Sequence, residues 1–249
     1  MPRIPVSSLR SGERAWKAAT IAYGDGITVN VGHGSVAVPG MLRALELAWK
    51  RHGALPWAEV LAPAVALARS GTYVGQTLGM WLGMAGRDIF FDQPESRETF
   101  FPNGSTALAA GEFYKPPHLD QSLELIAREG ADALYRGDLG RAFAEEISGN
   151  NGYVTREDLA AYRAEIREPL RLHSHGYHLA LNPPPSIGGA MAGSMIGLYD
   201  ALWQPGISEA EKVLLIARIQ RTMFDLRHQE GSAQSVSYTH LTLPTTRRV

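Results

Sequence analysis

The stretch EPLRLHSHGYHLALNPPPSIGG, residues 168–189, contains the sharpest change of pattern in the chain. Apolar residues occur in two extended runs on either side of Ser174–Gly176, which predicts two strands joined by a turn. The prolines that follow exclude a helix, whereas the paired glycines allow a tight backbone before a helix expected to begin near Ala190. The stretch therefore predicts a β-hairpin that leads into a helix through a proline-rich loop.

The sequence before this stretch is dominated by apolar residues at three- and four-residue spacing, the pattern of amphipathic helices. We expect the first two helices to form a helical hairpin, and Thr155 to cap a short helix. Residues 1–28 lack periodicity, and residues 90–115 are rich in turn residues, so both are expected to be irregular. Helices are predicted for the segments 41–52, 56–70, 73–86, 119–129, 139–148, 155–162 and 209–228.

Composition excludes several classes of protein. The 249 residues include 24 Lys and Arg against 25 Asp and Glu, and a net charge of −1 argues against a nucleic-acid partner. The chain has no cysteine, which excludes disulfides, thiolate metal sites and a cysteine nucleophile. No apolar run approaches the roughly 20 residues of a membrane span, and the start MPRIPVSSLR lacks the apolar core of a signal peptide.

The character of the sequence changes after Gln234. The string VSYTHLTLPTT, residues 236–246, resembles the translation of a sequencing-library adapter, so we interpret residues 235–249 as a non-native tail and residues 1–234 as the protein region. A natural Thr-rich strand is the alternative interpretation.

Segments spread over most of the chain resemble the γ-glutamyltransferase family, in that family's order. They are SVAVPG (35–40), HGALPWAEVLAPAVALARSG (52–71), GADALYRGDLG (130–140), GYVTREDLAAY (152–162), EPLRL (168–172) and NPPPSIGG (182–189). The resemblance implies an N-terminal-nucleophile hydrolase with a four-layer αββα fold, made as a precursor that cleaves itself into a large and a small subunit. The chain would then be a mostly helical α+β fragment of the large-subunit region.

The resemblance places the nucleophilic Thr at the start of the small subunit, beyond the end of the matching segment. No catalytic residue is therefore assigned, because the threonines of the tail (Thr239, Thr242, Thr245 and Thr246) lack the family's context. The substrate-binding residues stay unknown, since Arg3 and Pro5 are too loosely spaced to match the family's carboxylate-binding Arg. Ile187 replaces the second Ser of the family's PPSSGG. A structural role is predicted for the motif residues Pro39, Gly40, Pro184, Pro185, Ser186, Gly188 and Gly189.

The implied activity is cleavage of γ-glutamyl amides, including glutathione, through a Thr acyl-enzyme whose acyl group passes to water or an amine. The fragment itself is expected to be inactive without its small subunit, and no cofactor is implied. Family members are often periplasmic or secreted, but the compartment stays open here. The alternative is a non-catalytic binding or scaffold protein derived from the same fold.

Other residue patterns have structural and functional interpretations. A strand would place His173 and His175 on one side, as in some zinc sites, but a solvated turn is favoured and no metal is predicted. Gly188 and Gly189 either present amides to an anion at a helix start or allow a tight crossing. Structural roles are favoured for the remaining candidates, which are the Gly32–Ser35 turn, the tryptophans Trp49 and Trp57, and the acidic pair Glu157 and Asp158.

Overall fold

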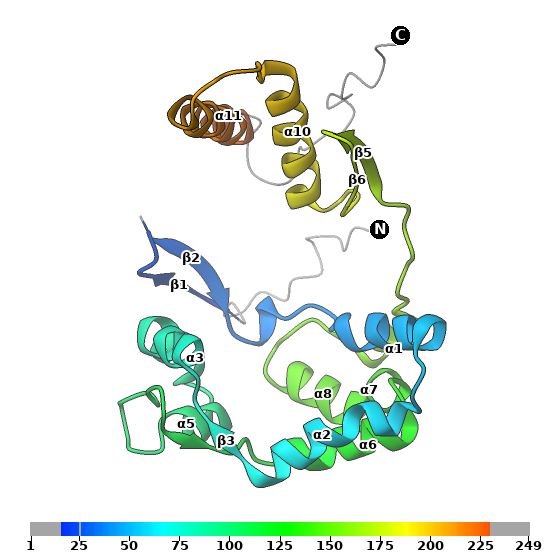
Figure 1. Cartoon of the computed structure of the whole chain (residues 1–249). Coiled ribbons are helices and arrows are strands. Elements are labelled where there is room, and N and C mark those ends of the chain that lie inside the picture. The colour runs from blue at the N-terminus through cyan, green and yellow to red at the C-terminus, as the bar shows by residue number, and fades with distance from the viewer. Residues whose placement is uncertain (1–15, 25, 230–249) are drawn as a thin grey trace. The chain divides into compact units, whose positions relative to one another are not determined.

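The computed structural model describes residues 16–24 and 26–229. The chain divides after Glu165 into two compact units, here called the N-unit and the C-unit, whose elements are shown in Figure 1. The predicted tail, residues 235–249, and its four threonines lie outside the described residues. The secondary structure is that of an α+β protein in which helices predominate over short two-stranded sheets.

The N-unit contains most of the helices. In chain order its elements are β1 (Lys17–Ile21), β2 (Ile27–Val31), a 3₁₀ turn (His33–Ser35), α1 (Met41–His52), α2 (Trp57–Ser70), β3 (Thr72–Tyr73), α3 (Gln76–Trp81), a π-helical turn (Leu82–Gly86), α4 (Arg87–Phe90), α5 (Pro94–Phe100), β4 (Phe113–Tyr114), α6 (Leu119–Glu129), α7 (Asp132–Tyr135), α8 (Asp138–Gly149) and α9 (Arg156–Ala161).

Local signals explain where several of these helices begin and end. Helix α2 ends at Ser70 with Gly71 as its C-cap residue, as the sequence predicts, but Pro56, expected in the first turn, is the N-cap residue. Helix α9 begins with a capping box, in which the Thr155 hydroxyl accepts from the Asp158 amide at 3.2 Å and the Asp158 carboxylate accepts from the Thr155 amide at 3.0 Å. The helix predictions for the N-unit are thus confirmed in their main outline, except that the helix predicted for 73–86 begins at Gln76, after strand β3, and continues as a π-helical turn from Leu82.

Two segments expected to be irregular contain regular structure. Strands β1 and β2 form an antiparallel hairpin with Lys17 opposite Val31, in which Ala19 and Ile21 are buried on one face. Strand β1, KAATI, is short and rich in small residues, so its alternation is hard to see, whereas β2, ITVNV, alternates apolar and polar residues. The turn-rich segment 90–115 is also not a surface excursion, because it contains α5 and buries Phe101 and Leu108.

Helices α1 and α2 do not form the helical hairpin that the sequence suggested. Helix α2 instead lies along α6, to which it is tied by a hydrogen bond from Trp57 Nε1 to the Ile126 carbonyl oxygen at 2.9 Å. An ion pair between Arg69 and Glu124 joins the same two helices. The short connection between α1 and α2 favours packing of these two helices on each other. In the structure, side-chain contacts to a helix far along the chain decide instead that α2 packs against α6.

The C-unit is a hairpin packed on a pair of helices. Strands β5 (Leu170–Ser174) and β6 (Tyr177–Leu181) are antiparallel, followed by α10 (Ile187–Leu202) and α11 (Glu209–Gln229). The small Gly193 lets α10 approach Leu170, Leu172 and Leu181 of the hairpin. The hairpin prediction is confirmed, but α10 begins three residues before Ala190, so both motif glycines lie in its first turn.

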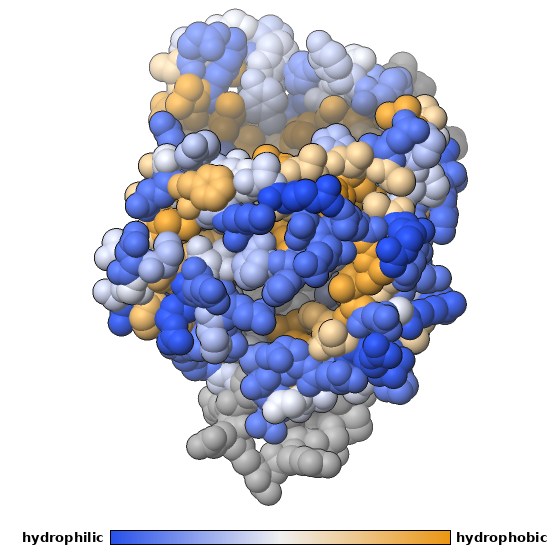
Figure 2. All heavy atoms as spheres, turned by 90° about the horizontal axis from the view of Figure 1, so that it is seen from below, coloured by the Kyte–Doolittle hydropathy of each residue, from blue (hydrophilic) through white to orange (hydrophobic). Residues whose placement is uncertain are grey.

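The core of the N-unit lies around α7, α8 and α9, where Tyr135 and Leu159 are almost completely buried. Large apolar side chains are also exposed, and Figure 2 shows apolar residues among hydrophilic ones on one face of the molecule. The large apolar side chains that are exposed to solvent include Met41 and Leu45 of α1 and Val213 of α11. Among residues 16–24 and 26–229, no helix combines the length and apolar character that a membrane span requires.

Candidate functional site

The Pro39–Gly40 motif is held by a buried tyrosine from far along the chain. The Tyr135 hydroxyl donates to the Pro39 carbonyl oxygen at 2.5 Å and accepts from the Arg43 amide at 3.2 Å. The Tyr135 ring stacks on Tyr162, with centroids 5.7 Å apart and planes inclined by 11°. A tyrosine buries well only when its hydroxyl has partners, and this one has two.

Gly40 is required by close packing. A Cβ atom at this position would lie 2.2 Å from the Tyr162 hydroxyl and 2.9 Å from its ring, so any larger residue would displace that ring. Residues from three of the family-like segments, 35–40, 130–140 and 152–162, therefore meet at one place. We call this cluster, formed by Pro39, Gly40, Arg43, Glu46, Asp132, Tyr135 and Tyr162, the tyrosine knot.

Charged side chains complete the tyrosine knot. Arg43 lies over the Tyr135 ring at 4.4 Å and forms ion pairs with Glu46 at 2.9 Å and Asp132 at 2.5 Å. Glu46 is buried, and one of its carboxylate oxygens accepts from the Ala131 amide at 2.9 Å while the other pairs with Lys50 at 3.0 Å. The carboxylate thereby links α1 to the start of α7.

These contacts shift the pKa values of the groups in the tyrosine knot. Burial alone would raise the pKa of Glu46, but hydrogen bonds from Ala131, Lys50 and Arg43 outweigh it and lower the pKa. The hydrogen bond from Arg43 lowers the pKa of Asp132, and burial raises the pKa of Tyr135. Burial would lower the pKa of Arg43, yet its two carboxylate partners raise it. All four groups keep their ordinary charge states near neutral pH, which suits a structural role.

The second motif, Pro184–Gly189, contains two glycines with different surroundings. A Cβ atom on Gly189 would lie 2.0 Å from the Asn182 carbonyl oxygen, whereas one on Gly188 would meet nothing within 4 Å. The Arg167 guanidinium donates to the Pro184 carbonyl oxygen at 2.9 Å, and the Ser186 amide donates to that of Pro183 at 3.1 Å. Gly189 thus allows the tight crossing considered from the sequence, while the packing does not explain Gly188.

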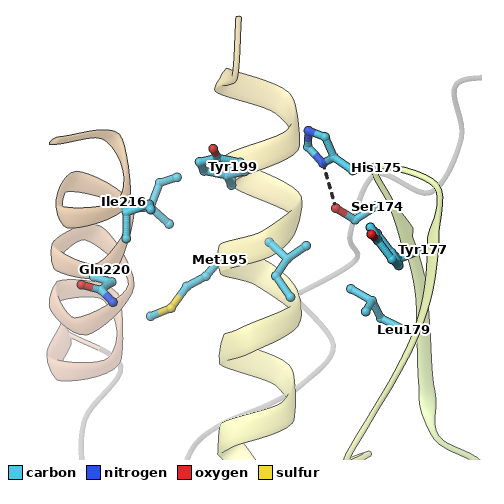
Figure 3. Close-up of a pocket in the computed structure, with 10 residues that line it drawn as sticks. Ser174, His175, Tyr177, Leu179, Met195, Tyr199, Ile216 and Gln220 are labelled. Carbon is cyan, nitrogen blue, oxygen red and sulfur yellow. Dashed lines mark hydrogen bonds between the residues drawn. The ribbon is translucent and has the colours of Figure 1, made fainter. Parts of the chain in front are cut away.

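A mainly apolar pocket of about 400 Å³ lies within the C-unit. Figure 3 shows its walls, which come from the hairpin, α10 and α11. Its volume falls within the range of small-molecule pockets. The lining residues are Ser174, His175, Tyr177, Leu179, Met195, Ile196, Tyr199, Ile216, Ile219 and Gln220.

A serine, a histidine and an aspartate meet at the rim of this pocket. The Ser174 hydroxyl donates to Asp200 Oδ1 at 2.8 Å, and His175 Nδ1 lies 2.8 Å from the same oxygen and 3.2 Å from Ser174 Oγ. Figure 3 shows the contact between Ser174 and His175. In a catalytic triad the serine donates to the histidine, which in turn contacts the acid. Here the serine donates directly to the acid, so the group anchors the hairpin turn to α10.

The three histidines of the hairpin do not act together. His175 lies in the turn, with a φ of 48°, whereas His173 and His178 oppose each other across the strands with ring centroids 4.9 Å apart. The expectation that His173 and His175 share one side is therefore wrong, because the strand ends at Ser174. Across residues 16–24 and 26–229, no group of three or more His, Cys, Asp or Glu side chains is placed to hold a metal ion.

The other sequence candidates have local structural partners. Ser35 donates to the Gly32 carbonyl oxygen at 2.7 Å in a turn. The rings of Trp49 and Trp57 lie 5.3 Å apart, and Trp49 Nε1 donates to the Leu55 carbonyl oxygen at 2.8 Å. The sequence reasoning missed Arg43, Tyr135 and Asp200, because their partners lie far away along the chain and no local spacing indicates them.

A family model described as Gamma-glutamyltranspeptidase matches residues 6–245 of the chain. Glutathione hydrolase 5 proenzyme of Mus musculus is 38% identical over 156 residues, which are 63% of this chain and 27% of that protein. Acylase ACY 1 proenzyme of Pseudomonas sp. (strain SE83) is 37% identical over 196 residues, which are 78% of this chain and 35% of that protein. The chain thus spans about a third or less of the length of these relatives.

Solved structures support the same relationship. A gamma-glutamyltranspeptidase from Pseudomonas nitroreducens, complexed with L-DON, superposes with a TM-score of 0.69 and 28% identity, over 80% of this chain and 59% of that chain. A cephalosporin acylase from Bacillus halodurans superposes with a TM-score of 0.68 and 27% identity, over 76% of this chain and 36% of that chain.

Proposed function

Because the chain belongs to the γ-glutamyltranspeptidase family, we propose that it is part of the large-subunit region of an enzyme that cleaves γ-glutamyl amides. The observation that carries the proposal is the family match over residues 6–245. Support comes from the structure, since three family-like segments share hydrogen bonds and ring contacts in the tyrosine knot. Because these contacts join the three segments directly, each segment helps to hold the other two in the same fold.

The proposed reaction uses a Thr hydroxyl as nucleophile, with the terminal amine as its own general base. Attack on the amide carbonyl gives a tetrahedral oxyanion held by backbone amides, after which the amine leaves and an acyl-enzyme remains. Water or an acceptor amine then takes the acyl group and regenerates the Thr. In this proposal residues 16–229 provide no reacting group, and the tyrosine knot holds α1, α7 and α9 in place.

The proposed fold of the whole enzyme is the four-layer αββα arrangement. Its support in this chain is the C-unit, where α10 packs on the β5–β6 hairpin, α11 packs on α10, and no further strand pairs with the hairpin among the described residues. A two-stranded sheet is rarely stable by itself, so additional strands would complete it. We propose that the small subunit supplies these strands and covers apolar residues now exposed, including Val213 and Phe224.

The proposed substrates are γ-glutamyl compounds, with glutathione as the first to test. Relatives of similar identity are named both glutathione hydrolase and acylase, so the acyl group and acceptor are left open within this class. Discrimination between such substrates depends on side chains that contact the reacting molecule. The proposal gives no such contact to the described residues.

The experiment that tests the proposal begins with the source DNA across the codons for residues 231–249 and onward, read from a library made without the suspected adapter. We expect the natural frame to replace the tail at 235–249 and to reach a Thr followed by an Asp-containing strand. The extended precursor should cleave itself into two chains and hydrolyse a γ-glutamyl anilide. The 249-residue chain alone should show no turnover.

One control variant and one contradicting outcome make the test decisive. Replacement of the new Thr by Ala should abolish both self-cleavage and turnover while leaving the circular dichroism spectrum unchanged. A natural stop after Val249, together with a cooperatively melting chain that is inactive, would overturn the proposal. In that case the non-catalytic scaffold becomes the better interpretation.

A further inference from the structure

The β5–β6 hairpin carries a histidine pair that the proposed function does not use. His173 and His178 are directly opposite in the strand register, and both side chains are exposed. Their ring centroids lie 4.9 Å apart with planes inclined by 60°. His175 is excluded from this pair, because it lies in the turn and its Nδ1 contacts Asp200 and Ser174.

This separation matches the geometry of two imidazoles on one metal ion. With metal–nitrogen bonds of about 2.0–2.1 Å and an angle of about 90–110° at the metal, two ring centroids lie about 4.5–5.2 Å apart. Rotation about the side-chain bonds at an exposed site can then aim one nitrogen of each ring at the ion. The paired strands hold the backbone of both residues in place, so little ordering is needed before binding.

We propose that His173 and His178 form a two-histidine site for a divalent late transition-metal ion, with water at the remaining positions. Imidazole suits Cu²⁺, Ni²⁺ and Zn²⁺, whereas Mg²⁺ and Ca²⁺ prefer oxygen ligands. Cu²⁺ is expected to bind most tightly, in accord with the general order of affinities among these metals. The site is independent of the proposed γ-glutamyl activity.

A neighbouring cation limits the affinity of the site. Arg171 lies two residues before His173 in the same strand and therefore on the same face of the hairpin. Arg171 forms an ion pair with Glu168 at 3.8 Å, and both side chains are well exposed. The guanidinium repels a metal ion, so replacement of Arg171 by an acidic residue should tighten binding by removing this repulsion and offering a carboxylate ligand.

The test uses the 249-residue chain, purified without an oligohistidine tag, and titrates it with Cu²⁺, Ni²⁺, Zn²⁺ and Mg²⁺ by calorimetry. The variants His173→Asn and His178→Asn should each weaken Cu²⁺ binding at least tenfold. The double variant should be little worse than either single one, because loss of one ligand already removes the chelate effect. His52→Asn, at the exposed end of α1, serves as the matched control and should bind as the parent does.

A second measurement identifies the site directly. In the chain labelled with ¹⁵N-histidine, substoichiometric Ni²⁺ should broaden the ring signals of His173 and His178 before those of the other six histidines. Arg171→Glu should tighten binding severalfold and retain this pattern. The proposal is wrong if either single variant binds Cu²⁺ as the parent does, if Mg²⁺ competes equally, or if other histidines broaden first.

Discussion

The two units of the chain bury different kinds of groups. In the N-unit, the charged side chains of the tyrosine knot pair with one another, although Arg43 Nε is buried without a hydrogen-bond partner among the described residues, and Tyr135 is only 1% exposed. In the C-unit, α10 lies against the hairpin through small residues, while α11 presents Val213, Leu214 and Phe224 to solvent. Both units expose large apolar side chains, such as Met41 and Val213, but the buried cluster of paired charged groups lies in the N-unit.

This difference indicates where each unit obtains its stability. Buried polar groups stabilise a fold only when all their hydrogen bonds are made within it, as Glu46 and Tyr135 make theirs. Large exposed apolar faces are typical of surfaces that another chain covers. We therefore expect changes in the tyrosine knot to act within the N-unit, and exposed positions of α11 to have little effect on the stability of the chain by itself.

The largest effect is expected at the centre of the tyrosine knot. Tyr135→Ala should destabilise the N-unit by about 3–5 kcal/mol, because it leaves a cavity and deprives the Pro39 carbonyl of its donor. Tyr135→Phe keeps the ring and should cost about 1–2 kcal/mol for the lost hydroxyl contacts. Urea unfolding followed by amide hydrogen exchange measures both. If both variants lost the same free energy of unfolding, the ring of Tyr135 would contribute nothing beyond its hydroxyl, and the prediction would be wrong.

The next effect separates two adjacent glycines of the C-unit. Gly189→Ala should destabilise α10 by about 1–3 kcal/mol, since the added methyl would meet the Asn182 backbone. Gly188→Ala meets open space and should be neutral or stabilising by up to about 1 kcal/mol, because Ala favours the helix. Hydrogen exchange of peptides from α10 provides the comparison. A destabilising Gly188→Ala would point to a contact outside residues 16–229.

Acid should weaken the N-unit through Glu46 and Asp132. Both carboxyl groups have a lowered pKa in the fold, so their contribution to stability is fully present above the ordinary carboxyl pKa and is lost as the pH falls through the lower folded values. Thermal unfolding between neutral pH and pH about 3 should show this loss. Glu46→Gln should flatten the profile, and an unchanged slope would show that other groups control acid unfolding.

The smallest effect on stability is expected on α11. Val213→Asp should change the free energy of unfolding by no more than about 0.5 kcal/mol, because this side chain is 66% exposed. It should nevertheless reduce the fluorescence of a hydrophobic dye bound to the chain. Arg218→Gln, five residues further along the same helix, is a control that leaves the apolar surface intact. A parent chain that binds no dye would remove the contrast between the units.

Local patterns predicted much of this fold. The Thr155 cap, the glycines that end α1 and α2, and the two apolar runs of the hairpin act through neighbours a few residues away, so the sequence reveals them. The order of six short segments was also enough to indicate the family. Weak local signals failed, as in β1, where small residues conceal the alternation.

Residue identity and short-range spacing were enough to indicate the family, the helix-rich composition and the boundaries of most helices. Three contacts became visible only in the folded chain: α2 packs along α6, Tyr135 hydrogen-bonds the Pro39 carbonyl, and Asp200 binds the hairpin turn. The hydrogen-bonded residues are 69 positions apart for Trp57 and Ile126, 96 for Tyr135 and Pro39, and 26 for Ser174 and Asp200. Their partners are chosen by chain packing, which no local pattern encodes.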